Sequence, residues 1–461
     1  MLADPATDFP RWYQDVIDKA QLAENGPVRG TMIIRPWGYA IWELIQGELD
    51  QRIKAAGHTN AYFPLFIPHS FFLKEAEHVE GFSPELALVT HAGGEKLAEP
   101  VVVRPTSETI IGEAMSRWIQ SHRDLPMLLN QWGNAVRWEL RPRLFLRTTE
   151  FLWQEGHTAH SSFDEAQQHT LRVLNDVYGD FIHRALAIPA ILGRKTDREK
   201  FAGAKYTYTL EGLMGDGKAL QMGTSHNMGE NFAEAFNIRY TGADGQLHSC
   251  STTSFGVSTR IVGGLIMTHG DAHGLRLPPV IAPIQVVLIA LTAEVLPTAE
   301  MLCADLVRLG VRAAVDARTD VSFGRRTVDW ELKGVPCRLE IGMRELADRS
   351  VTLIRRDLPG KRSLAVEGLV ASIPRLLEDI QQSLFTQAEE RQQSMTRDVK
   401  RIDEVDGPGF SRLSWSSLGV QGELDLVERG QTVRCLVRED GEVPDLDYPE
   451  ERLVAYVAKA Y

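Results

Sequence analysis

The sequence predicts an α+β protein in which hairpins and helices come first and strands alternate with helices later. Two segments indicate hairpins: residues 137–157, with β-rich arms on either side of Pro142, and residues 204–223, where strand-like arms flank the turn Asp216-Gly217. From residue 283 to residue 382, apolar strand-like runs alternate with amphipathic helices. This alternation is typical of a parallel or mixed sheet covered by helices, so we expect a second unit there.

Length and charge narrow the possible architectures. A chain of 461 residues is too long for one hydrophobic core, and we expect three units at residues 1–282, 283–382 and 383–461. The net charge of −12 argues against non-specific coating of nucleic acid, although it permits a local basic face. Residues 312–362 carry 12 Lys and Arg against 8 Asp and Glu, a balance of +4. That is a modest electrostatic footprint for RNA, and a solvated charged face remains the alternative.

The sequence offers no sign of disulfides, of a cysteine-based metal site or of a membrane segment. No C-x-x-C pair occurs among the four cysteines, which are Cys250, Cys303, Cys337 and Cys435. The opening MLADPATDF has neither the basic nor the apolar region of a leader, and the longest apolar run, near residues 285–293, is too short to cross a bilayer. We therefore expect a protein of the reducing cytoplasm.

The segment from Arg137 to His157 is built to hold an anion. Side chains alternate in direction along an extended arm, so Arg137 and Glu139 are expected to share one face. Residues of the return arm share a face in the same way, namely Arg147, Thr149, Phe151, Trp153 and Glu155. Guanidinium groups bind phosphate or carboxylate, and a ring beside them can stack on a base. A surface hairpin with cross-strand ion pairs is the alternative reading of the same residues.

Polar residues also gather where other expected strands end. Thr106 and Glu108 lie at a strand-to-helix junction, where capping is the usual role, and His226 follows an expected strand end with Gln221 and Thr224 nearby. Arg260 opens an apolar segment after the glycine-containing SFGVST. An arginine entering such a segment needs an anionic partner, which could be a protein carboxylate or a ligand phosphate.

A set of short strings carries a resemblance to a known family. The strings RPTSET, FLRTTEFLWQEGHTAH, KFAGA, GTSH, WELKGVP and the terminal VAKAY occur in this order. Together with the proline-containing AYFPLFIP and with SFGVSTR, they resemble motifs 1, 2 and 3 of class II aminoacyl-tRNA synthetases, and most closely the prolyl-tRNA synthetases of archaeal and eukaryotic type. The resemblance runs from about residue 10 to residue 390 and returns at the last residues.

The resemblance implies a fold, an activity and partners. It implies a class II antiparallel sheet with flanking helices, an α/β anticodon-binding domain and a small α+β C-terminal domain. The implied activity is the ATP-dependent ligation of L-proline to tRNA(Pro) through a prolyl-adenylate, with Mg²⁺ accompanying ATP. A cytoplasmic homodimer is implied as well, and a partner subunit could cover the edge at Pro64, although an intramolecular cover is equally compatible with the pattern.

Site residues follow from the motif positions. The resemblance gives catalytic roles on the phosphates and the proline carboxylate to three arginines, which are Arg137, Arg147 and Arg260. For proline it implies contacts from Thr106, Glu108, Arg137, Trp153, His157, Phe201 and His226. For ATP it implies contacts from Arg137, Glu139, Arg147, Thr148, Phe151, Gln221, Thr224, Ser258 and Arg260. For the anticodon the candidates are Lys333, Arg338 and Glu340, with intradomain ion pairs as the alternative.

Two departures from the family pattern matter. Only Cys435 lies in the region that holds clustered cysteines in zinc-bearing members, so we expect no structural zinc. The span from His157 to Gly256 is too short for the editing insertion of bacterial-type enzymes, so mischarging with alanine or cysteine is expected unless another protein clears it.

The terminal tyrosine, which turns its carboxylate to the active site in the family, is kept as Tyr461. A non-catalytic RNA binder is disfavoured because Arg137, Arg260 and Glu108 are all present, and an enzyme that acylates another carrier is disfavoured because the second unit is present.

Overall fold

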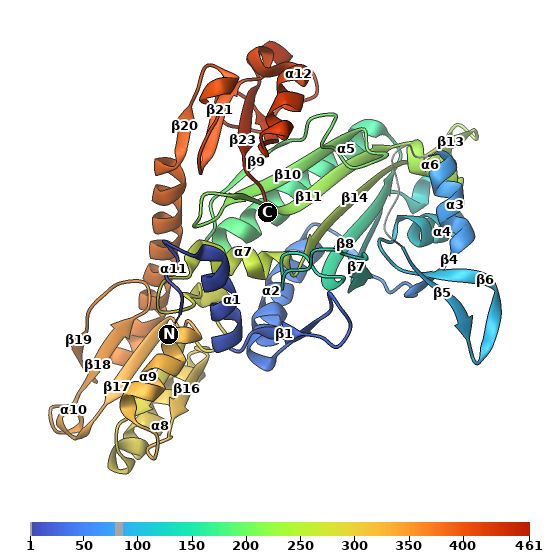
Figure 1. Ribbon diagram of the computed structural model, residues 1–461. Helices are drawn as coiled ribbons and strands as arrows, with labels where there is room; N and C mark the ends of the chain where they lie inside the picture. Colours follow the sequence, from blue (N-terminus) through green and yellow to red (C-terminus); the bar gives the residue numbers. More distant parts are fainter. Residues whose placement is uncertain (1, 79–85) are drawn as a thin grey trace.

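The structure is a computed structural model that describes residues 2–78 and 86–461, with a long sheet at its centre (Figure 1). The middle of this sheet is antiparallel and runs in the order β9, β10, β11, β14, β8, β7. These strands are β9 (Ala190–Arg194), β10 (Tyr206–Leu213), β11 (Ala219–Gly229), β14 (Ser251–Ser258), β8 (Glu150–His160) and β7 (Met127–Val136). The antiparallel sheet with flanking helices expected for the first part of the chain is thereby confirmed.

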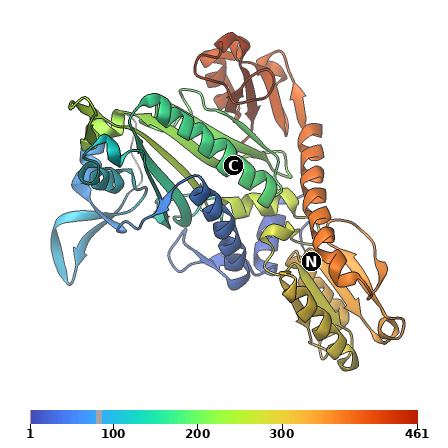
Figure 2. The same cartoon turned by 180° about the vertical axis from the view of Figure 1, so that it is seen from behind.

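Helices cover the central sheet and form the main core with it. Helix α2 (Pro36–Ala55) buries Ile41, Ile45, Leu49 and Ile53 at helical spacing and is followed by Gly57 in the left-handed region. Helix α5 (Phe163–Arg172) starts at a Ser162 cap and continues in wider turns to Ala185, crossing the sheet from behind (Figure 2). The others are α1 (Phe9–Lys19) and α7 (Arg260–His269), and the short β3 (Thr59–Asn60) pairs with β7.

A smaller lobe lies beside β7 and β8. Its three-stranded sheet contains β4 (Phe66–Pro68), β6 (Glu95–Val103) and β5 (Ala87–Ala92). Pro64 lies just before β4, which is an edge strand of this sheet, so no ladder hydrogen bond is lost at the proline. The accompanying elements are α3 (His69–His78), α4 (Glu108–Trp118), α6 (Asn231–Phe236), β12 (Arg239–Thr241) and β13 (Leu247–Ser249), while β1 (Ala23–Asn25) pairs with β2 (Met32–Ile34) near α1.

The second unit has the mixed sheet that the strand and helix alternation predicts. Three strands are parallel, in the order β16 (Ala313–Asp316), β15 (Val286–Ala290) and β17 (Cys337–Ile341). Two antiparallel strands, β18 (Ser350–Arg355) and β19 (Arg362–Ala365), complete the sheet. Its helices are α8 (Leu296–Arg308), α9 (Phe323–Leu332) and α10 (Met343–Ala347).

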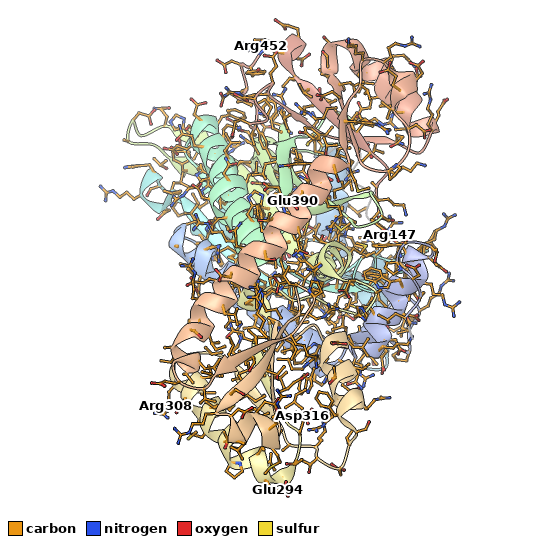
Figure 3. The ribbon with its side chains drawn as sticks, turned by 90° about the vertical axis from the view of Figure 1, so that its left-hand side faces the viewer. Arg147, Glu294, Arg308, Asp316, Glu390 and Arg452 are labelled. Atoms are coloured by element: carbon orange, nitrogen blue, oxygen red, sulfur yellow. The ribbon has the colours of Figure 1, made fainter. Side chains whose placement is uncertain are left out.

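The last part of the chain joins the central sheet. Helix α11 (Leu369–Ser394) runs unbroken through residue 382, where the sequence suggests a boundary, and connects the lower and upper parts of the molecule (Figure 3). The C-terminal segment, residues 395–461, then forms β20 (Thr396–Asp398), β21 (Phe410–Ser414), α12 (Trp415–Glu428), β22 (Thr432–Val437) and β23 (Val454–Ala458). Because Leu436 pairs with Arg194, these strands extend the central sheet to eleven strands.

Two local expectations are wrong. The hairpin arms end at Val136 and resume at Glu150, so Arg137, Glu139 and Arg147 lie in a loop and not on strands. The loop exists because its apolar tip folds back, with Phe145 and Leu146 buried in the main core. The segment at Gln221 to His226 is the middle of β11 and not its end, because β10 pairs with β11 up to Asn227 and β14 pairs with it up to Gly229.

Candidate active site

One face of the central sheet carries a cavity of about 410 Å³. Strands β8, β11 and β14 supply its floor, while the loop at residues 137–149 and the segment at residues 199–207 supply its walls. Every residue that the sequence suggests for proline or ATP lines this cavity. The set is Thr106, Glu108, Arg137, Glu139, Arg147, Thr148, Phe151, Trp153, His157, Phe201, Gln221, Thr224, His226, Ser258 and Arg260.

Strand register explains why residues far apart in sequence meet here. Alternation along β8 turns Phe151, Trp153, Glu155 and His157 to the same face of the sheet. On β14, Ser254 pairs with both His157 and His226, and Ser258 pairs with Trp153. The cavity floor is therefore a set of cross-strand neighbours held by the sheet and not by flexible loops.

One end of the cavity is built on carboxylates. The Thr106 hydroxyl donates to Glu108, which opens α4, and the Ser107 hydroxyl donates to Glu155. Gln131 Nε2 donates to Glu155 Oε1 at 2.8 Å, and His157 Nε2 lies 3.1 Å from Glu155 Oε2. Each oxygen of the buried Glu155 thus has a partner, whereas Glu108 keeps acceptor capacity towards the cavity.

Burial and charge act against each other at this end. Burial alone would raise the pKa of Glu155, but the hydrogen bond and charge of His157 outweigh it and hold the pKa below the usual 4.5. Burial alone would lower the pKa of His157, but the Glu155 hydrogen bond and the Glu108 charge bring it above 6.5. Each member of the pair therefore favours the charged form of the other, the carboxylate of Glu155 and the protonated imidazole of His157.

The adjacent wall is neutral and largely apolar. Burial, followed by the charge of His157, lowers the pKa of His226 to about 3, so this imidazole stays uncharged. The Phe201 ring lies 4.7 Å from the His226 ring, and Thr207 Oγ1 is 2.9 Å from His226 Nδ1. Trp153 completes the wall, and its Nε1 is buried without a hydrogen-bond partner among the described residues. A small ring could be enclosed by these three side chains.

The other end of the cavity is cationic. Arg137 stacks 5.5 Å from the rings of both Phe151 and Trp153, and its Nε donates to Pro105 O at 3.1 Å. Burial, followed by the charges of Arg137 and Arg147, lowers the pKa of Arg260 to about 10. Within residues 2–78 and 86–461, Arg260 forms no ion pair with a carboxylate. Such clustered positive charge is costly without an anion, so this end fits a phosphate-bearing ligand.

The chain terminus lies beside the cationic end. A second cavity of about 310 Å³ shares Leu146, Arg147 and Arg260 with the first and is also lined by Tyr461. The Tyr461 hydroxyl donates to Asp216 Oδ2 at 2.6 Å, and its ring lies 5.3 Å from the Arg143 guanidinium carbon. The last residue is therefore next to the arginines.

The three anticodon candidates lie outside both cavities, and Arg338 and Glu340 form ion pairs within their own region, whereas Lys333 reaches α2. Arg338 pairs with Glu331 at 3.2 Å and with Glu340 at 3.0 Å, and Lys361 also reaches Glu340 at 3.0 Å. The Lys333 ammonium lies 5.3 Å from the Trp37 ring. Arg338 still lines a separate cavity of about 360 Å³, together with Arg276, Trp330, Arg355 and Arg356.

Some site residues are absent from the sequence-derived set. Glu155, Thr207 and Ser254 line the cavity, and Glu155 is the buried centre of the carboxylate end. The signal for Glu155 was its place in the alternation after Phe151 and Trp153. Across the described part of the chain, no group of three or more His, Cys, Asp or Glu side chains is arranged to hold a metal ion. No described helix is both long enough and apolar enough to pass through a bilayer.

Comparisons with known proteins agree with this geometry. A family model for the class II tRNA synthetase core domain (G, H, P, S and T) matches residues 93–269, and one for the anticodon binding domain matches residues 285–376. The chain is 55% identical to a proline–tRNA ligase of Frankia alni over the whole of both chains. It is 48% identical to that of Roseiflexus castenholzii over 94% of this chain and 92% of the relative.

Solved structures give the same relationship. The fold matches a prolyl-tRNA synthetase of Cryptosporidium parvum complexed with halofuginone and AMPPNP, with a TM-score of 0.91 and 37% identity, covering 100% of this chain and 99% of that one. It also matches a complex of that protein with L-proline and AMP, with a TM-score of 0.91 and 35% identity, covering 100% and 96%. The expected fold, a class II synthetase core followed by an anticodon-binding domain, is confirmed by these matches together with the observed sheets.

Proposed function

The chain belongs to the proline–tRNA ligase family, and we propose that it ligates L-proline to tRNA(Pro) through a prolyl-adenylate, releasing AMP and pyrophosphate. The observation that carries this proposal is the difference in charge between the two ends of one cavity. Carboxylates and an apolar wall form one end, and Arg137, Arg147 and Arg260 form the other. An amino acid with an ammonium group fits the first end, and a nucleoside triphosphate fits the second.

The two steps need positioning more than proton transfer. In the first step, a proline carboxylate oxygen attacks the α-phosphorus of ATP, and the bond to pyrophosphate breaks. No general base is required because the carboxylate is already ionised. In the second step, a terminal tRNA hydroxyl attacks the prolyl carbonyl and AMP leaves. Charge spreads over phosphate oxygens in the first transition state, so preorganised cations and alignment supply most of the catalysis.

Arg137 is the residue that brings the two reactants together in this proposal. Its guanidinium lies at the cationic end, 5.5 Å from the rings of both Phe151 and Trp153, where it can bind the proline carboxylate and the α-phosphate. Arg147 and Arg260 bind the outer phosphates. Phe151 stacks on the adenine, and the remaining adenosine contacts come from Glu139, Thr148, Gln221, Thr224 and Ser258.

Mg²⁺ enters with ATP in this account. The described residues offer no group of three or more His, Cys, Asp or Glu side chains that could hold a metal ion, so these residues form no cage for the ion. Mg²⁺ commonly keeps several waters and takes phosphate oxygens with only one or two protein carboxylates, which fits this donor set. The ion would share the phosphate charge with the arginines. We expect no structural zinc in the C-terminal segment, where Cys435 is the one cysteine.

Recognition of proline rests on two acceptors and a small enclosed wall. Because the Thr106 hydroxyl hydrogen is committed to Glu108, the Thr106 oxygen can accept one ammonium hydrogen while Glu108 accepts the other. Trp153, Phe201 and His226 enclose the ring, with His157 beside them. Such walls discriminate by only about 1 to 3 kcal/mol per methylene, so slow mischarging with alanine or cysteine is expected.

We also propose a homodimer formed through the small lobe. Large apolar side chains are exposed there, with Tyr62 77%, Phe66 53% and Trp118 46% accessible. Patches of this kind mark interaction sites, and a second copy would cover the open edge at β4. Sedimentation as a monomer at micromolar concentration would contradict this assignment.

The remaining assignments concern the subtype, the compartment and the tRNA. We assign the chain to the archaeal and eukaryotic type, supported by the match to the Cryptosporidium parvum enzyme along the whole chain and by the short elements between β8 and β14. We place it in the cytoplasm, where tRNA is charged. Lys333, Arg338 and Glu340 remain the anticodon candidates, with Arg338 supported by its position on a cavity rich in arginine.

Proline-dependent pyrophosphate exchange, followed by charging of purified tRNA(Pro), tests the function. Exchange together with charging is the expected result. Exchange without charging would mean that the adenylate is formed for another acyl carrier. The absence of both reactions in folded protein would favour the reading of a non-catalytic RNA binder.

A further inference from the structure

We propose that Arg434 of the C-terminal segment is a positioning residue for ATP, acting through a buried chain of hydrogen bonds that ends at Gln221. The chain passes through Glu211 and Thr209, both on β10. This inference rests on the proposed function, because it gives the C-terminal segment a part in the ATP step of that reaction.

The first link is a buried ion group at Glu211. Arg434 Nε and Nη2 lie 3.0 Å and 2.9 Å from Glu211 Oε2, and Lys195 Nζ lies 2.9 Å from Oε1. The side chains are 9%, 0% and 2% exposed for Arg434, Glu211 and Lys195. Removing one partner from such a group leaves charge uncompensated away from water, so Arg434 cannot be lost without a response at Glu211.

The second link fixes the direction of the hydrogen bonds. The Thr209 hydroxyl donates to Glu211 Oε1 at 2.9 Å, because an ionised carboxylate can only accept. The Thr209 oxygen can then only accept from Gln221, whose Nε2 lies 3.3 Å away. The amide of Gln221 is thereby held with its nitrogen towards Thr209, which leaves Oε1 and one N–H for the cavity that Gln221 lines.

The same group also acts on the phosphate end by its charge. Arg434, Glu211 and Lys195 together carry one net positive charge. Both Glu211 and Arg434 act on Arg260, the former raising and the latter lowering its pKa after the larger effects of burial and the neighbouring arginines. Loss of Arg434 would therefore remove one positive charge close to the outer phosphates of ATP.

Close packing keeps the C-terminal segment in place for this role. Gly193 on β9 pairs with Thr209, and a Cβ atom there would lie 2.7 Å from Leu436 O and 2.8 Å from Cys435 Cβ. Strand β22 therefore fits against β9 only because residue 193 has no side chain. Arg434 therefore reaches Glu211 from a strand that packs closely against β9.

The first test compares Arg434→Met with Arg434→Lys and with Arg452→Met, a matched control at an exposed ion pair in the same segment (Figure 3). In proline-dependent pyrophosphate exchange, Arg434→Met is expected to raise the KM for ATP by about tenfold, a loss on the scale of one charge-assisted hydrogen bond, and to leave the KM for proline within about twofold. Arg434→Lys keeps the charge and is expected to recover part of the loss. Arg452→Met should match the wild type.

The second test changes Thr209, the middle residue of the hydrogen-bond chain between Arg434 and Gln221. Thr209→Val removes the hydroxyl, and Thr209→Ser keeps it, so only the valine variant is expected to raise the KM for ATP. Because Arg434 and Thr209 act in series, the double variant Arg434→Met/Thr209→Val should lose no more than the larger single effect. Additive losses, or a KM for proline that rises equally, would overturn the proposal. If Arg434→Met fails to fold, the comparison of Thr209→Val with Thr209→Ser tests the proposal in its place.

The outcomes separate this inference from the proposed function. Wild-type protein without proline-dependent exchange would refute the function itself. Wild-type exchange with an unchanged KM for ATP in folded Arg434→Met, or in Thr209→Val, would refute only the role of the C-terminal segment.

Discussion

Glu155 Oε2 lies 3.1 Å from His157 Nε2 at the carboxylate end of the cavity, and both side chains are buried. They occupy alternate positions on β8 and so point to the same face of the sheet. The pair links the strand that forms the floor to the helix cap at Ser107 and Glu108. Its charge state therefore bears on both stability and proline binding.

The Glu155–His157 pair should make the free energy of unfolding depend on pH in the range where His157 loses its proton. The pKa of His157 in the folded state is raised above 6.5. The stabilisation that protonated His157 gives the folded state is therefore fully present below pH 6.5 and is lost as pH rises through the folded-state pKa. The free energy of unfolding of the wild type should fall with rising pH in this window, and His157→Asn should remove that part of the slope. Chemical denaturation between about pH 6 and pH 9 measures it. The exposed His122→Asn is the control, and an unchanged slope in His157→Asn would contradict the assignment.

Arg260 should matter for catalysis and not for stability. It lies close to Arg137 and Arg147, and burial with their charges lowers its pKa to about 10. Arg260→Met should cut proline-dependent exchange by at least about a hundredfold, near 3 kcal/mol of transition-state stabilisation. Its free energy of unfolding should not fall, because a repulsive contact is relieved. Arg308→Met, at an exposed ion pair on α8, is the control, and a variant that is inactive only because it unfolds would refute the phosphate role.

Glu108 should affect proline and leave ATP alone. Glu108→Gln keeps the shape but removes the charge that faces the ammonium group, so the KM for proline should rise by roughly ten- to a hundredfold, the range of a charged hydrogen bond. The KM for ATP should stay within about twofold. Glu113→Gln on the same helix, at an exposed pair with Arg117, is the matched control. An equal rise in both constants would place Glu108 in a general structural role.

Much of the site is predicted through the resemblance of its motifs to a known family, and regular strands explain why several of those motif residues meet. Trp153 and His157 alternate along β8, and their neighbours come from strands whose hairpin turn at Asp216-Gly217 is visible in the sequence. The loop at residues 137–149 could not be read in this way, because its shape depends on Phe145 packing into a distant core. A local pattern of alternating residues does not contain that information.

The joining of β22 to β9 is a second feature that no local pattern predicts. The contact depends on one pair, Leu436 with Arg194, and on the missing side chain at Gly193. Leu436 is more than two hundred positions from Gly193 and Arg194, and the sequence around these residues has no distinctive pattern. The ion group at Glu211 is likewise not predicted by a local pattern, since one of its two cationic partners, Arg434, comes from the far end of the chain.

The terminal residue should support the first step of the reaction. Tyr461 N donates to Ala219 O at 3.1 Å, and its ring lies 4.8 Å from Lys218 Nζ and 5.3 Å from the guanidinium carbon of Arg143. Deleting Tyr461 removes the ring and moves the chain-terminal carboxylate away from the cavity that contains Arg147 and Arg260. We expect proline-dependent exchange to fall by about tenfold, the scale of one lost cation–π contact in a partly buried site.

The matched variant Tyr461→Phe keeps the ring and the terminal carboxylate and loses only the hydroxyl bonded to Asp216. It should retain most of the exchange activity, and both variants should melt within a few degrees of the wild type, because the C-terminal segment remains anchored by β22 and β23. Unchanged exchange in the protein that lacks Tyr461 would show that this residue does not assist adenylate formation. Equal losses in both variants would instead assign the effect to the contact with Asp216, since that contact is the only change they share.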